Sequence, residues 1–166
     1  MQYVDHTKNI IQIKNISYSF GKQKVLKDIS FNVHRGDYLG IIGPNGGGKT
    51  TLVKIILGLL KASEGTVEMF GEDIRNFKDW QKIGYIPQKA INFDANFPVT
   101  VSEVVSMGLF AKKGLLRFLG DEDHKKVIHA LRLVEMEEYG NHLIGDLSGG
   151  QQQRIFIAKA LVTELS

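Results

Sequence analysis

The residues of this chain best suited to chemistry stand at positions 43–50, where the spacing is G-x-x-x-x-G-K-T. Glycines allow backbone conformations that other residues avoid, and they let main-chain amides approach an anion closely. Lys49 can then reach the β- and γ-phosphates of a nucleotide, and the Thr50 hydroxyl can ligate Mg²⁺. We therefore predict a phosphate-binding loop, the P-loop, made of Gly43, Pro44, Asn45, Gly46, Gly47, Gly48, Lys49, Thr50 and Thr51.

A second glycine-containing turn, Leu147-Ser148-Gly149-Gly150-Gln151, stands ahead of an expected helix that extends to about Thr163. Ser148 is a strong candidate for the N-cap of this helix, and the two glycines leave its first backbone amides uncovered. Such a turn is common and, taken alone, usually binds nothing. In a chain that also carries a P-loop, it predicts a second helix start able to bind an anion.

The segments around the P-loop have the pattern of a strand followed by a helix, which the motif requires. Residues 38–42 form a short apolar run suited to a buried strand, and residues 51–57 have the pattern of a mostly apolar helix. Another short apolar run, at 83–87, ends next to Gln88. These patterns predict an α/β fold, with further strands at residues 10–13, 29–33 and 66–70.

Helices are expected in the second half of the chain. Thr100 and Glu103 have the spacing of a capping box, which marks the start of a helix. Asp121 can cap a further helix that runs to about Glu138 with apolar residues on one face.

Composition narrows the class of protein. The 166 residues suffice for one domain with a core, and the net charge of +3, with scattered basic residues, argues against nucleic acid as a partner. The absence of cysteine excludes disulfides and thiolate metal sites and suits a reducing compartment. No signal-peptide pattern opens the sequence, and no apolar run approaches the roughly 18–20 residues of a membrane span. A protein of this kind that works at a membrane works from its surface.

With both motifs present, the chain resembles the nucleotide-binding domain of an ABC ATPase over essentially all of its length. Leu147 to Gln151 matches the LSGGQ signature of that family. The resemblance implies a P-loop NTPase core, in which helices cover a parallel sheet, with an N-terminal antiparallel β element and a helical subdomain, incomplete at the C-terminus. The implied parts are the antiparallel β part (1–35 and 64–72), the P-loop core (36–63 and 80–88), the helical subdomain (89–146) and the signature motif with its helix (147–166).

The resemblance also implies roles for individual residues in binding ATP and Mg²⁺. Phe20, directly before the Gly21 turn, would stack on adenine, with Tyr18 as the second candidate, although by its residues alone this aromatic favours packing in a sheet. Val25 would pack beside the nucleotide. Gln88 would be the glutamine that contacts Mg²⁺ and the attacking water, and it would share the catalytic role with Lys49. In the family, a second nucleotide-binding domain binds head to tail, and its ATP faces Ser148, Gly149, Gly150 and Gln151.

Residues 93–108 resemble the corresponding stretch in the ATPases of zinc and manganese importers, and some iron-chelate importers are similar here. In the family, the region after Gln88 abuts the transmembrane permease subunits. The resemblance therefore implies an ATP-binding subunit that couples ATP binding and hydrolysis to import of a divalent metal ion. It would be a peripheral protein at the cytoplasmic face of the cell membrane, and the metal would cross the membrane subunits without touching this chain.

The family has a strand ending in Asp, a catalytic Glu and a switch His after the signature helix, and none has a counterpart before Ser166. We therefore expect these 166 residues to bind MgATP but to hydrolyse it far more slowly than a complete domain. Two other functions remain open: a soluble ABC ATPase without a membrane partner, and a non-catalytic remnant that binds nucleotide. A small-molecule kinase also uses a P-loop, but the signature motif argues against it.

Overall fold

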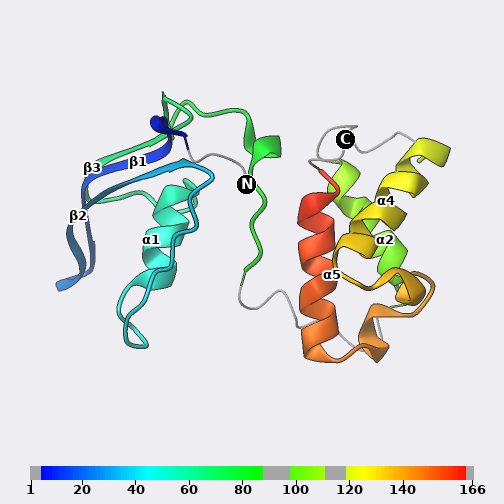
Figure 1. The fold of residues 1–166 in the computed structure, drawn as a ribbon. Coiled ribbons are helices and arrows are strands. Elements are labelled where there is room, and N and C mark those ends of the chain that lie inside the picture. The colour runs from blue at the N-terminus through cyan, green and yellow to red at the C-terminus, as the bar shows by residue number, and fades with distance from the viewer. Residues whose placement is uncertain (1–4, 88–97, 111–118, 164–166) are drawn as a thin grey trace. The chain divides into compact units, whose positions relative to one another are not determined.

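The computed structural model describes residues 5–87, 98–110 and 119–163 (Figure 1). The chain divides into two compact units, Met1–Lys78 and Asp79–Ser166. Each unit has its own set of buried apolar side chains. Throughout the described ranges, the helices are too short or too polar to cross a lipid bilayer.

The first unit is built on a four-stranded sheet in which every neighbouring pair is antiparallel. Long strands β1 (Asp5–Phe20) and β2 (Gln23–Arg35) form a hairpin, and Gly21 at its turn has a φ of 58° that favours glycine. The shorter β3 (Glu64–Met69) and β4 (Glu72–Asp73) complete the order β2-β1-β3-β4. This sheet confirms the antiparallel N-terminal element expected from the sequence.

Helix α1 (Lys49–Ile56) belongs to the first unit and begins within the P-loop, at Lys49. It buries Leu52, Ile55 and Ile56, while β1 buries Ile13 and Ile16. A pocket of about 330 Å³ lies beside these residues, lined by Ile16, Ile55 and side chains of β3 and the 58–62 loop. The apolar content of residues 51–57 is therefore explained by burial, as the sequence predicts.

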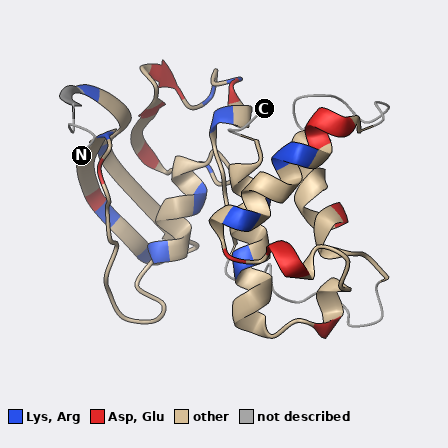
Figure 2. Ribbon diagram, turned by 45° about the vertical axis from the view of Figure 1, so that its right-hand side comes forward, with Lys and Arg blue, Asp and Glu red and all other residues tan. Residues whose placement is uncertain are grey.

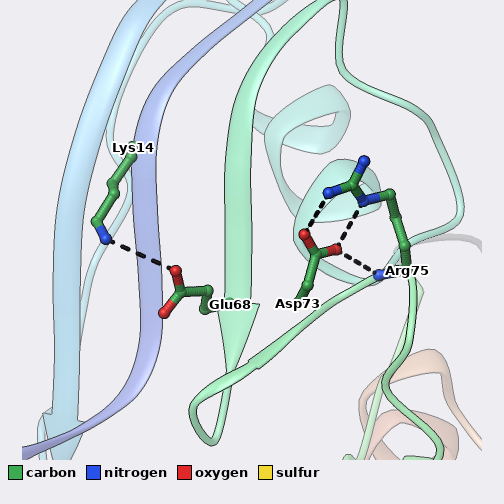
Figure 3. A network of polar contacts seen from close by, with 4 residues as sticks. All are labelled: Lys14, Glu68, Asp73 and Arg75. Atoms are coloured by element: carbon green, nitrogen blue, oxygen red, sulfur yellow. Dashed lines mark hydrogen bonds and ion pairs between the residues drawn. The ribbon is translucent and has the colours of Figure 1, made fainter.

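Two ion pairs join charged side chains on and beside β3 and β4 (Figure 3). Lys14 Nζ lies 3.6 Å from Glu68 Oε1, a diagonal contact between β1 and β3. The Asp73 carboxylate accepts hydrogen bonds from the Arg75 backbone N–H at 2.9 Å and from its guanidinium at 2.6 and 2.8 Å. These bonds lower the pKa of Asp73 from 3.8 to about 2, because they stabilise the ionised form.

The predicted strands at 38–42 and 83–87 are absent from the structure, and this part of the sequence interpretation was wrong. Neither segment pairs with another strand in the described parts of the chain. Tyr38 and Ile42 are almost fully exposed, at 101% and 97%. A strand exists only where a neighbour accepts and donates its ladder hydrogen bonds, and an apolar pattern cannot supply that neighbour. The parallel sheet is therefore not among the strands that the structure describes.

The second unit is helical, as expected for its middle part. Helices α2 (Val101–Ser106), α4 (Asp121–Leu133) and α5 (Gly149–Leu161) surround one cluster of buried apolar residues. Four short 3₁₀ helices also belong to the described part of this unit: η1 (Trp80–Lys82) precedes α2, η2 (Met107–Leu109) follows it, and η3 (Glu137–Tyr139) and η4 (Ile144–Asp146) lie between α4 and α5. Figure 1 shows α2, α4 and α5 packed side by side.

The sequence predicts the starts of α2 and α5 correctly, but neither the cap nor the end of α4. The capping box at α2 is confirmed, since Thr100 Oγ1 accepts from the Glu103 N–H at 3.3 Å and the Glu103 carboxylate accepts from the Thr100 N–H at 2.7 Å.

The predicted cap of α4 was wrong: Asp121 is the first residue of the helix, Gly120 is its N-cap, and the Gly120 N–H donates to the Asp123 carboxylate at 3.0 Å. The helix ends at Leu133, five residues before the expected end. Its continuation is blocked by Glu135, whose φ of 57° is left-handed.

Candidate functional site

The P-loop ends in a helix start whose backbone amides are left without a side-chain cap. Gly48 occupies the N-cap of α1 with a left-handed φ of 81°, and no side chain of the described residues bonds to the first turn. The first turn has no acidic residue, and the charged residues of α1 are both basic, Lys49 and Lys54 (Figure 2). Uncapped amides and the positive end of a helix dipole together favour a bound anion such as phosphate.

Two features make glycine necessary at position 48. Its positive φ is one that L-residues rarely adopt. In addition, a Cβ at this position would lie 2.8 Å from Leu26 Cδ2 and 3.1 Å from Val25 Cγ1, both closer than normal packing allows. The P-loop therefore lies directly against β2, at the position where Val25 forms a bulge between the Lys24 and Leu26 pairs.

Lys49 holds the P-loop together from within. Its ammonium donates to the carbonyl oxygens of Gly43 and Pro44, both at 2.7 Å. The Gly47 N–H closes the same loop onto the Pro44 carbonyl at 3.1 Å. Phosphate oxygens bound to this loop would compete with the two carbonyls for the protons of the ammonium.

The residues predicted to contact the base lie around the β1–β2 hairpin. Phe20 is the last residue of β1 and is 76% exposed, so its ring is available to stack on a planar group. Tyr18 lies two residues earlier, half-buried and opposite Leu26. Val25 is half-buried against Gly48. The structure thus brings Val25 to the P-loop, and the stacking roles of Phe20 and Tyr18 stay predictions.

The signature turn starts α5 with a complete capping box. Ser148 is the N-cap, and its Oγ accepts from the Gln151 N–H at 3.4 Å. The Gln151 Oε1 atom accepts from the Ser148 N–H at 2.9 Å and from its hydroxyl at 3.0 Å. Gly149 and Gly150 are exposed, and a Cβ at Gly150 would meet nothing within 4 Å. Helix α5 carries Arg154 and Lys159 but no acidic residue (Figure 2).

Sequence reasoning missed Gln152, a buried residue (7% exposed) whose side chain bonds to the chain ahead of the signature turn. Its Nε2 donates to the carbonyl oxygens of Ile144 and Leu147, at 3.0 and 3.1 Å. A run of three glutamines gives no signal that one of them is buried. The position of Gln152 within the helix does give such a signal, because the buried Ile155 and Phe156 follow it at helical spacing.

The Mg²⁺ site can be tested only in part. Gln88 lies outside the described residues, so its predicted contact with the metal stays a prediction. Thr50 is exposed in the first turn of α1, and a hydroxyl there suits Mg²⁺, which prefers oxygen ligands and shares them with phosphate oxygens. Among the described residues, no three His, Asp or Glu side chains gather to hold a metal ion by themselves.

Three features together define the class of ABC ATPases. One helix starts at a P-loop, another starts at an LSGGQ motif, and the second of these helices belongs to a helical unit. The family description "ABC transporter" matches residues 26–166, and the chain belongs to this family.

Among individual proteins, the chain is similar to the zinc uptake system ATP-binding protein ZurA of Listeria monocytogenes. The two are 50% identical over 156 residues, which cover 94% of this chain and 61% of ZurA. The manganese transport system ATP-binding protein MntB of Halalkalibacterium halodurans is 43% identical over 93% of this chain and 60% of its own. The high-affinity zinc uptake system ATP-binding protein ZnuC of Bacillus subtilis is 41% identical, over 93% of this chain and 66% of ZnuC. The chain thus spans about three fifths to two thirds of these relatives.

Solved structures confirm the P-loop NTPase fold. The structure of cbiO1 from Clostridium perfringens, part of an ABC transporter complex, matches with a TM-score of 0.78 and 29% identity over 95% of this chain and 62% of its own. The ATP-binding cassette MJ0796, a dimer in a post-hydrolysis state with ADP and phosphate, matches with a TM-score of 0.75 and 31% identity. The match covers 93% of this chain and 70% of the MJ0796 chain.

Proposed function

We propose that this chain is the ATP-binding part of an ABC transporter subunit that drives the import of a divalent metal ion. The observation that carries the proposal is the start of α1, which has no side-chain cap and whose first residue, Lys49, bonds through its ammonium to the preceding loop. The names of the similar proteins, which are zinc and manganese transport ATP-binding proteins, support the choice of cargo.

ATP would bind with its phosphates on the amides of the P-loop and the first turn of α1. Lys49 would leave the carbonyls of Gly43 and Pro44 to contact the β- and γ-phosphates. Thr50 and Gln88 would share Mg²⁺ with phosphate oxygens. Phe20, or Tyr18 as the second candidate, would stack on adenine, and Val25 would pack beside the nucleotide.

The signature turn would act on the ATP of a second nucleotide-binding domain, in a head-to-tail dimer. Ser148, Gly149, Gly150 and Gln151 would then face that γ-phosphate, so that ATP itself forms part of the dimer contact. Permease subunits would bind the region after Gln88, which places the protein at the cytoplasmic face of the cell membrane as a peripheral subunit. The dimeric state of the similar cassette MJ0796 supports the dimer.

We further propose that the 166-residue polypeptide alone binds MgATP and hydrolyses it far more slowly than a polypeptide that also carries the family's catalytic glutamate. Phosphoryl transfer depends on groups that orient the attacking water as well as on groups that hold the phosphates. Phosphate release can be measured for both polypeptides at the same concentration. Equal rates would contradict this part of the proposal.

The transport function is tested in cells and by purification. We expect an affinity-tagged protein to co-purify with a polytopic membrane subunit, and deletion of the gene to lower the uptake of radioactive zinc or manganese. The metal whose uptake falls identifies the cargo, and a Lys49→Ala copy of the gene should not restore it. Normal uptake of both metals, with no membrane subunit recovered, would favour a soluble ABC ATPase instead.

A further inference from the structure

Gln152 is the buried polar side chain of α5, and its two hydrogen bonds lead backward along the chain. Its Nε2 donates to the carbonyls of Ile144 and Leu147, which belong to η4 and to the residue before Ser148. A buried amide without partners costs free energy, so a carboxamide stays in an apolar core only where its bonds are made. The Gln152 side chain therefore fixes the direction of both carbonyls.

The Leu147 carbonyl is part of the peptide bond that joins Leu147 to Ser148. Its direction is linked to the extended conformation of Ser148, with φ −60° and ψ 155°, which the N-cap of α5 requires. The capping box of Ser148 and Gln151 holds the exposed side of the turn. Gln152 holds the buried side, so the turn is fixed from two directions.

The second bond of Gln152 connects the signature turn to the start of α2. The Ile144 N–H donates to the Val99 carbonyl at 3.0 Å, and the Val101 N–H donates to the His142 carbonyl at 2.9 Å. Thr100 and Leu143 form an antiparallel bridge between these bonds. Because Gln152 bonds to the Ile144 carbonyl, the start of α5 is tied to this bridge by a side chain as well as by the backbone.

We propose that Gln152 is a positioning residue for nucleotide binding by the signature turn. Its carboxamide holds the peptide before Ser148 so that Ser148, Gly149 and Gly150 are already oriented for the phosphate of a partner domain. Pre-orientation of this kind improves affinity because less ordering remains to be done on binding. The inference rests on the proposed function, since it assumes that the signature turn contacts ATP across a dimer.

The test compares Gln152→Met, which keeps the length of the side chain and removes the donor, with Gln153→Met, the same change at an exposed neighbour. Both are made in the complete protein that the gene encodes. Two constants are measured: the dissociation constant of the dimer formed with a non-hydrolysable ATP analogue, and the affinity of dilute monomer for a fluorescent ATP analogue. Gln152→Lys, which returns an N–H donor at similar reach, serves as the rescue variant.

We expect Gln152→Met to weaken the dimer about tenfold, which corresponds to about 1.4 kcal/mol, while the monomer's affinity for nucleotide stays unchanged. Gln153→Met should behave as the wild type, and Gln152→Lys should recover part of the loss. Unchanged dimerisation of Gln152→Met would overturn the inference. So would equal losses of dimerisation and monomer binding, or failure of both Gln152 variants to fold, because these results indicate a role in stability alone. A wild type that stays monomeric with the analogue would instead overturn the proposed function.

Discussion

The two helix starts that carry the family motifs are built in opposite ways. Helix α1 begins at a left-handed glycine, Gly48, and no side chain of the described residues caps it. Helix α5 begins at Ser148, which has an extended conformation. A capping box holds the exposed side of this start, and the Gln152 carboxamide holds its buried side. The first leaves the amides of its opening turn to a ligand, whereas the second bonds the Ser148 and Gln151 amides within its own capping box.

This difference assigns different tasks to the two motifs. An uncapped helix start gains most from an anion, because the anion supplies the acceptors that the amides lack. A capped start is stable without a ligand, since a cap contributes about 1 kcal/mol to a helix. The P-loop is therefore suited to primary binding of ATP, and the signature turn is suited to present a fixed surface to a phosphate that arrives already bound.

The largest effect is expected from removal of the P-loop cation. Lys49→Ala should weaken the binding of MgATP roughly ten- to hundredfold, because a charged hydrogen-bond donor to phosphate is lost. Lys54→Ala is the matched control on the same helix, where the side chain is exposed, and it should leave the affinity unchanged. Isothermal titration calorimetry gives both values. Equal affinities for wild type and Lys49→Ala would contradict the P-loop assignment.

The two motifs should also respond differently when a methyl group is added to a glycine. Gly48→Ala should lower the free energy of unfolding by roughly 1–3 kcal/mol, because its φ is left-handed and the new Cβ would meet Leu26 and Val25. Gly150→Ala should leave stability unchanged or raise it by up to about 1 kcal/mol, since its position is helical and open.

Urea denaturation of the two glycine variants measures this contrast. A Gly150→Ala variant that loses as much stability as Gly48→Ala would show that the two starts are equally strained. A Gly150→Ala variant that is stable yet weakens ATP-driven dimerisation would show that the glycine serves close approach of the phosphate.

The parts of the site that the sequence predicts are those fixed by local spacing. The predicted capping box at Thr100 and the predicted N-cap at Ser148 each depend on residues no more than three positions apart, so local spacing specifies their bonds. Local spacing could not show that residues 38–42 and 83–87 form no strand, because a strand depends on a neighbour supplied by a distant part of the chain. Gln152 was missed for the same reason: its importance comes from the carbonyls that the preceding turn brings to it.

A smaller effect is expected at the cap of α5. Ser148→Ala should lower the free energy of unfolding by about 1 kcal/mol, because the Gln151 N–H loses its acceptor. Ser148→Asp should keep the stability, since Asp is as good a cap, but its negative charge should repel phosphate and weaken ATP-driven dimerisation. Thermal denaturation and sedimentation velocity separate the two properties. Loss of stability in the Asp variant would show that Ser148 has a role other than capping.

The smallest expected effect is on the pH dependence of stability. It comes from Asp73, which lies outside both helix starts. Asp73 has a pKa lowered from 3.8 to about 2 by its hydrogen bonds to Arg75, whose side chain is largely exposed. A carboxyl with a lowered folded pKa stabilises the fold above its unfolded pKa, and this contribution is lost as the pH falls through the folded pKa. The difference in unfolding free energy between wild type and Asp73→Asn should therefore be constant above about pH 5 and shrink as the pH falls towards 2. Because neither the P-loop nor the signature turn contains a carboxylate, ATP binding should not follow this profile; if it does, the ion pair beside β4 is coupled to the nucleotide site.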